Sequence, residues 1–155
     1  MIKFTEAQQH AKKFFGIKEL VCKHVYDRWG EDAWQFIDDK LLEVLYIIRL
    51  YLDKPIVVNN WAKGGSYSQR GLRCNVCALV REKSNLEKVY ISAHLQGKGV
   101  DFHVPGLTSE QVRDFIVGIK RQLPHPIRIE LDTEGWVHVD IRNSSTTEKI
   151  VFFKG

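Results

Sequence analysis

Residues 92–104, SAHLQGKGVDFHV, hold side chains whose types and spacing could do chemistry. Asp101 stands in an apolar run, and a buried carboxylate without a partner costs free energy. His94 precedes it by seven residues, and Gly97 and Gly99 between them let the backbone turn back. We therefore expect the two side chains to meet at a common partner, and a metal ion is one that binds both an imidazole and a carboxylate.

A second group of ionisable residues comes from the segment IRIELDTEGWVHVDIR, which has the pattern of a β-hairpin. DTEG suits a type I turn followed by a left-handed glycine, and this turn sets the register. Glu130 then faces His138, and Arg128 faces Asp140, on the face that also carries Trp136. Such a face is either exposed to solvent or a site. The opposite face is apolar and is expected in the core: Ile127, Ile129, Leu131, Val137, Val139 and Ile141.

His94, Asp101 and His138 together form a donor set of two imidazoles and one carboxylate. This set is common at catalytic zinc, where the fourth position stays open for water. Zinc makes such a water acidic enough to attack an amide when a general base is near. Glu130 is placed for that role by the hairpin register. His103 could support one of the metal ligands, but we expect it to be exposed.

Both segments resemble the signatures of the zinc D-alanyl-D-alanine carboxypeptidase family, whose fold is shared by the hedgehog signalling domain. SAHLQGKGVD is similar to the motif Ser-x-His-x-x-Gly-x-Ala-x-Asp at Ser92, His94, Gly97 and Asp101, and departs from it at Gly99. WVHVD resembles the second signature, a tryptophan-containing strand with the third ligand. ELVCKHVYDRWG, KPIVVNNW and QRGLR extend the resemblance to small phage or prophage-type members.

The resemblance implies that the two histidines and the aspartate bind zinc, but it leaves the base open. Many members place the catalytic glutamate three residues before the last histidine, and Gly135 occupies that position here. Glu130 is our first choice, because hedgehog-like relatives carry a glutamate further upstream on the same strand. Glu134, at the turn, is second. Asp140 is third, and it could pair with Arg128 instead.

The resemblance also implies an arginine after the first strand, which matches Arg70 in YSQRG. This side chain would bind a substrate carboxylate or stabilise the developing oxyanion. Arg73 is the alternative. Gln69 and Ser92 are candidates for substrate-binding or supporting groups, and Trp136 either lines the cleft or covers the hairpin.

Three cysteines, Cys22, Cys74 and Cys77, are a poor number for a disulfide framework. CNVC could supply two ligands of a structural zinc site, with Cys22 and His24 of CKH as the others, although such sites more usually have two tight ligand pairs. A redox pair in CNVC is a further alternative. We expect ordinary reduced thiols.

Length and composition favour one globular domain over 1–155. The net charge of +4 and the pI of about 9 favour anionic partners, but the basic residues are dispersed, so nucleic acid is not expected. No apolar run is long enough to span a bilayer, and the N-terminus lacks a signal-peptide core. We expect a monomer that is cytoplasmic as synthesised and reaches the cell wall after release or as a virion part.

The elements that must position these residues are read from periodicity and turn signals. Apolar residues recur at three- and four-residue spacing in the longest helical segment, and Pro55 stops it. Helices first and strands later predict an α+β fold, with N-terminal helices packed on a small antiparallel sheet that carries the metal site. The expected helices cover 5–15, 17–30, 31–52 and 108–123; the expected strands cover 55–61, 87–94, the hairpin and 150–155, with a polar turn over 143–149.

Together these expectations predict a zinc-dependent peptidase that hydrolyses amide bonds of peptidoglycan stem peptides. It would act as a D,D-carboxypeptidase or an endopeptidase, and an endolysin-like role is one option. The first alternative is a zinc-containing hedgehog-like binding domain without catalysis, because of the glycine at position 135. The second is a metal-free interaction domain in which the histidines are incidental.

Overall fold

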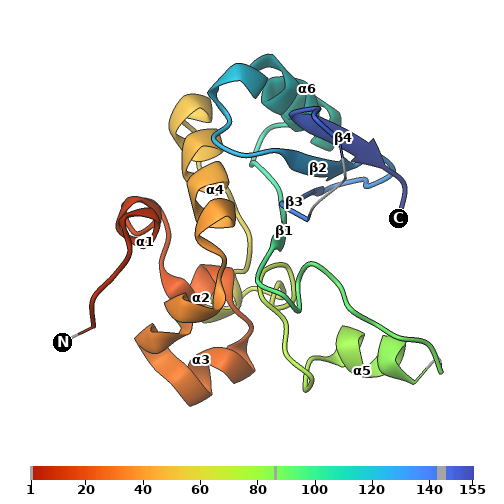
Figure 1. The fold of residues 1–155 in the computed structure, drawn as a ribbon. Helices are drawn as coiled ribbons and strands as arrows, with labels where there is room; N and C mark the ends of the chain where they lie inside the picture. The colour runs from red at the N-terminus through yellow and green to blue at the C-terminus, as the bar shows by residue number, and fades with distance from the viewer. Residues whose placement is uncertain (1, 86, 143–145) are drawn as a thin grey trace.

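A computed structural model describes residues 2–85, 87–142 and 146–155 (Figure 1). These residues form an α+β fold of six α-helices and a four-stranded mixed sheet. The α-helices are α1 (Glu6–Ala11), α2 (Ile17–Leu20), α3 (Lys23–Trp29), α4 (Asp39–Leu52), α5 (Ala78–Ser84) and α6 (Ser109–Gly118). The strands are β1 (Gly99–Phe102), β2 (Ile127–Glu130), β3 (Val137–Asp140) and β4 (Ile150–Phe153). Short 3₁₀ helices are η1 (Gly30–Phe36), η2 (Trp61–Lys63) and η3 (Lys120–Gln122).

The predicted helix starts agree with the structure where a capping residue is present. Thr5 and Thr108 cap α1 and α6, each in a reciprocal capping box with the glutamine three residues later. The helix expected over 17–30 is instead two helices, because Val21 is extended and bridges Leu72. The helix expected from residue 31 begins as α4 after Asp38, which caps it, while the preceding segment is η1.

The sheet has the order β1-β3-β2-β4, with β3 antiparallel to both β1 and β2. β4 pairs with β2 in parallel, so the expectation of an antiparallel sheet is wrong at this edge. β2 and β4 both run opposite to β3, so they are parallel to each other where β4 pairs at the outer edge of β2. Residues 143–145 of the expected polar turn lie outside the described residues.

The predicted hairpin register is confirmed, since Arg128 faces Asp140 across β2 and β3. Leu131 was expected in the core but is exposed, because β2 ends at Glu130 and the next residue belongs to the loop. The remaining residues of the apolar face are buried within the strands or half-buried just beyond: Ile127, Ile129, Val137, Val139 and, half-buried, Ile141.

Two predicted strands, over 55–61 and 87–94, are wrong. The first makes only an isolated bridge between Val57 and His103, although Ile56 and Val58 are buried, so its apolar residues serve packing and not a ladder. The second is irregular in its described part. The strand next to β3 is β1, which carries Asp101 and was not predicted as a strand.

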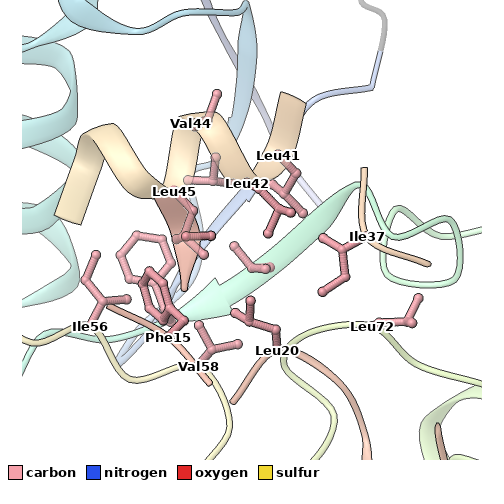
Figure 2. Close-up of a cluster of buried hydrophobic side chains, with 14 of the residues drawn as sticks. Phe15, Leu20, Ile37, Leu41, Leu42, Val44, Leu45, Ile56, Val58 and Leu72 are labelled. Atoms are coloured by element: carbon pink, nitrogen blue, oxygen red, sulfur yellow. The ribbon is translucent and has the colours of Figure 1, made fainter. Parts of the chain in front are cut away.

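The core lies between α4 and its neighbours on both sides (Figure 1). α1 packs against α4 on one side, and the sheet lies on the other, with α6 over β3. Figure 2 shows Leu41, Leu42 and Leu45 of α4 gathered with Leu20 and Val58 from other segments. This packing holds β1 and β3, and therefore the candidate site, against the helical part.

Gly97 lets the loop before β1 approach η1 closely. Its φ is 67°, and a Cβ there would lie 2.0 Å from the carbonyl oxygen of Phe36. The Gly97 carbonyl in turn accepts a hydrogen bond of 2.9 Å from the backbone of Asp38. Only glycine fits both the conformation and the contact.

Among the described helices, none is long and apolar enough to cross a bilayer.

Candidate metal centre and cleft

His94, Asp101 and His138 converge, with one ligand atom from each lying within 4.8 Å of the others. Asp101 in β1 is the register partner of His138 in β3, so two of the three side chains are cross-strand neighbours. His94 comes from the loop before β1. Its Nε2 lies 3.3 Å from Asp101 Oδ2, and His138 Nδ1 lies 2.8 Å from Asp101 Oδ1. All three side chains are buried.

The orientation of His94 is set by a backbone carbonyl. Its Nδ1 lies 2.9 Å from the carbonyl oxygen of Gly71. Because a carbonyl can only accept, Nδ1 carries a proton, and Nε2 is the ring nitrogen that faces Asp101. This hydrogen bond is the arrangement that holds metal-binding histidines in one tautomer.

The orientation of His138 is set by Asp140, which is fully buried. His138 Nε2 donates to Asp140 Oδ2 at 2.8 Å. Arg128 donates two hydrogen bonds of 2.8 Å to the same carboxylate, one to each oxygen. Burial alone would raise the pKa of Asp140, but the hydrogen bonds from His138 and Arg128 lower it to about 2. Asp140 therefore stays ionised and acts on His138.

The close contacts among His94, Asp101 and His138 shift the pKa values of Asp101 and His138. Burial opposes the ionised form of Asp101, yet hydrogen bonds from His138 and His94 outweigh it and hold the pKa of this carboxyl well below its ordinary value. Burial would likewise lower the pKa of His138, but Asp101 and Asp140 raise it to about 9. In the metal-free protein the ionised Asp101 carboxylate therefore lies beside a cationic His138.

A cleft opens over this group, in two adjoining hollows of about 330 and 290 Å³. Both are lined by Arg73, Asp101 and Trp136, so the tryptophan does line the cleft. The larger hollow adds His94, His138 and Glu130 to its walls. A still larger hollow of about 660 Å³ lies near the N-terminus, between residues 2–8 and 31–39, and holds neither histidine nor cysteine.

The three candidate bases lie in different surroundings. Glu130, at the end of β2, is half-buried and lines the cleft with the two ligand histidines. Glu134 is exposed in the loop between β2 and β3 and lines neither hollow of the cleft. Asp140 makes the pair with Arg128 that the hairpin register allowed, and its buried carboxylate is engaged on both oxygens.

Arg70 and Arg73 both line the cleft, with different partners. The Arg70 guanidinium lies 3.5 Å from the ring centre of Tyr67, and its Nη1 is 2.7 Å from His103 Nδ1. His103 is therefore half-buried against Arg70 rather than exposed. Arg73 Nη2 lies 3.3 Å from Asp101 Oδ2. The sequence did not indicate this contact, because it depends on how the loop folds over β1.

Gln69 and Ser92 have local structural contacts. Gln69 Oε1 accepts a hydrogen bond of 2.9 Å from the backbone of Leu79, which ties the loop to α5. Ser92 Oγ accepts one of 3.3 Å from the backbone of Leu95, and Ser92 lies in the wall of the cleft. Both side chains remain near the cleft, but their hydrogen bonds order the loops that form it.

A second group of donors lies apart from the cleft histidines. Cys22, His24, Cys74 and Cys77 each bring one ligand atom within 4.8 Å of the others, so this cluster could hold a metal ion. The cysteines form no disulfide. Ordinary reduced thiols were the first expectation, but the structure brings together the four residues named in the alternative, a structural zinc site.

Comparison with known proteins returned no match from family models, curated proteins or solved structures. What the chain can do is therefore inferred from its donor groups. The cleft offers two imidazoles and a carboxylate together with Glu130, Arg70 and Arg73. Such a combination suits metal-assisted attack on a carbonyl group in a substrate that carries negative charge.

Proposed function

We propose that the protein is a zinc-dependent peptidase that hydrolyses amide bonds of peptidoglycan stem peptides, as a D,D-carboxypeptidase or an endopeptidase. The observation that carries the proposal is the convergence of His94, Asp101 and His138 in a cleft that also contains Glu130. The resemblance of SAHLQGKGVD and WVHVD to the two signatures of the zinc carboxypeptidase family supports the substrate class.

The ligand atoms of the three residues are of types that bind zinc, and both histidines are oriented by further hydrogen bonds. Imidazole and carboxylate ligands suit this metal, and a three-residue set leaves a position for water or substrate. One nitrogen of His94 is bound to the Gly71 carbonyl and one nitrogen of His138 to Asp140. His94 Nε2, His138 Nδ1 and the Asp101 carboxylate are the atoms that would hold the ion.

Zinc at this position would supply Lewis acidity, which polarises the amide carbonyl and acidifies the attacking water. Glu130 takes the proton from that water and later returns it to the nitrogen of the departing amine. Asp140 keeps His138 oriented throughout, because Arg128 fixes its carboxylate. Trp136, at the mouth of the cleft, covers one side of the bound peptide.

The two arginines supply the recognition of charge. Arg70 is held by Tyr67 and His103, so its guanidinium has a defined place in the wall. A substrate carboxylate or a developing oxyanion is the group such a guanidinium binds best. The net charge of +4 adds a weaker long-range attraction towards an anionic cell wall.

The test is turnover of purified peptidoglycan and of a synthetic stem peptide ending in D-alanyl-D-alanine, with zinc present. We expect Glu130→Ala to lower kcat by about 10²- to 10⁴-fold while the bound zinc is unchanged, because general bases contribute rate accelerations of this size. Glu134→Ala is the matched control, since that glutamate is exposed outside the cleft. Its kcat should equal that of the wild type.

Two results would contradict parts of this proposal. A Glu130→Ala variant with undiminished kcat would show that another group is the base. A wild-type protein that binds zinc in the cleft but cleaves neither substrate would exclude the peptidase.

The second outcome would support the alternative, a zinc-containing hedgehog-like binding domain. One observation favours that alternative. Gly135, where many members carry the catalytic glutamate, has a φ of 80°, a conformation that a glutamate adopts only with strain.

A further inference from the structure

We propose that Cys22, His24, Cys74 and Cys77 bind a structural zinc ion, separate from the cleft. The cluster would hold the ion through three thiolates and one imidazole. A closed four-ligand set of this kind has no open position and therefore serves stability and not catalysis. The inference goes beyond the proposed peptidase activity and does not depend on it.

Four of the six donor–donor distances in the cluster are close to the edges of a zinc tetrahedron, and the other two are within 4.8 Å. Zn–S bonds of about 2.3 Å and Zn–N bonds of about 2.0 Å place tetrahedral ligands about 3.8 Å apart for two sulfurs and about 3.5 Å apart for sulfur and nitrogen. Cys74 Sγ lies 3.7 Å from Cys22 Sγ and 3.9 Å from Cys77 Sγ. His24 Nδ1 lies 3.7 Å from Cys74 Sγ and 3.8 Å from Cys77 Sγ.

A disulfide is a poor account of the same geometry. The sulfur separations of 3.7 and 3.9 Å are almost twice the length of an S–S bond, which is about 2.05 Å. A disulfide would also use only two of the three cysteines and would leave His24 without a role. The four donor atoms instead all lie within 4.8 Å of one another.

The backbone around the cluster suits thiolates. The backbone N–H of Cys74 donates to Cys77 Sγ at 3.4 Å. Hydrogen bonds of this kind stabilise the charged form of a ligand sulfur. Cys22 and Cys77 are buried while His24 is exposed, so the ion would lie just below the surface.

The cluster joins two distant parts of the chain beside the cleft. Cys22 and His24 flank the start of α3, whereas Cys74 and Cys77 precede α5. The segment 71–74 connects the two candidate sites: Gly71 accepts from His94, Arg73 contacts Asp101, and Cys74 belongs to the cluster. A zinc ion there would fix the loop that forms one wall of the cleft.

The experiment uses the full-length protein stripped of metal and titrated with Co²⁺. Thiolate ligands give an intense near-ultraviolet charge-transfer absorption with cobalt, and the cleft site, which has no sulfur donor, cannot give it. We expect this absorption to reach its full value at one thiolate-bound cobalt per chain and Zn²⁺ to abolish it. We also expect all three thiols to resist alkylation with zinc bound and to react after chelation.

His24→Ala tests the ligand set without emptying the interior, because His24 is exposed. We expect it to weaken cobalt binding at the thiolate site by at least tenfold, whereas His125→Ala, a histidine outside both clusters, should leave that affinity unchanged. Absence of the charge-transfer absorption in the wild type, or alkylation at equal rates with and without zinc, would overturn the proposal. Neither readout involves peptidase activity, so failure of one proposal is distinguishable from failure of the other.

Discussion

Asp140 is the residue on which the position of His138 depends. It is fully buried and accepts hydrogen bonds from both Arg128 and His138. We expect Asp140→Asn to lower metal affinity of the cleft by about 10- to 100-fold, as loss of such supporting groups does at other metal sites. The variant should also lose roughly 3 kcal/mol of unfolding free energy, because the buried pair loses its negative partner. Metal titration and urea denaturation measure the two effects.

Asp132→Asn is the matched control at the residue scale. Asp132 is exposed, and its contact with Lys154 is long at 4.0 Å. Surface pairs of this kind contribute little, so the unfolding free energy should change by less than about 0.5 kcal/mol. Equal behaviour of the two asparagine variants would refute the role given to Asp140.

At the scale of elements, the close packing of β1 against β3 depends on Gly99. A Cβ at this position would lie 2.7 Å from Cβ of Ala93 and 3.3 Å from Cε1 of His138. We expect Gly99→Ala to lower the unfolding free energy by about 1–3 kcal/mol, as overpacking does, and to weaken metal binding by displacing His138.

Gly118→Ala is the comparison for this prediction. Gly118 ends α6, and a Cβ there would meet nothing within 4 Å. Alanine should leave metal binding unchanged and stabilise the protein by up to about 1 kcal/mol, since it restricts the unfolded chain. If Gly99→Ala proves as harmless as Gly118→Ala in urea denaturation and metal titration, β1 is less tightly packed than described.

At the scale of the whole molecule, α4 supports both the helical part and the sheet. Leu42 is fully buried in it, and Leu50 in the same helix is 44% exposed. We expect Leu42→Ala to lower the unfolding free energy by about 2–5 kcal/mol and Leu50→Ala to lower it by less than about 1 kcal/mol. Urea denaturation of both variants at equal metal loading gives the comparison, and a similar loss in both would contradict the assigned core.

Much of the local structure could be predicted from the sequence, because short-range physics determines it. Thr5 indicated one helix start, and Thr108 or Ser109 another, at which the structure has Thr108 as the cap. The DTEG turn indicated the pairing of Arg128 with Asp140. Caps and turns depend on neighbouring residues alone, so the sequence contains the whole signal. The spacing of glycines after His94 likewise indicated that Asp101 could meet it.

The sequence alone was misleading for segments whose secondary structure and strand pairing depend on long-range packing. Residues 55–61 look like a strand, but they bury Ile56 and Val58 without a ladder. β4 is parallel to β2 because it pairs with β2 and not with β3, the strand that precedes it in the chain. Local patterns cannot report which edge of a sheet is free.

For the two candidate sites as well, some features could be predicted from the sequence and others depend on the tertiary structure. Residue types and spacing by themselves determined the donor set of His94, Asp101 and His138. Only the tertiary structure decided that Arg73 reaches Asp101 and that Cys22 and His24 meet the CNVC cysteines across some fifty residues. Spacing constrains side chains within one segment, whereas contacts between segments depend on how the core packs, and no local pattern encodes that packing.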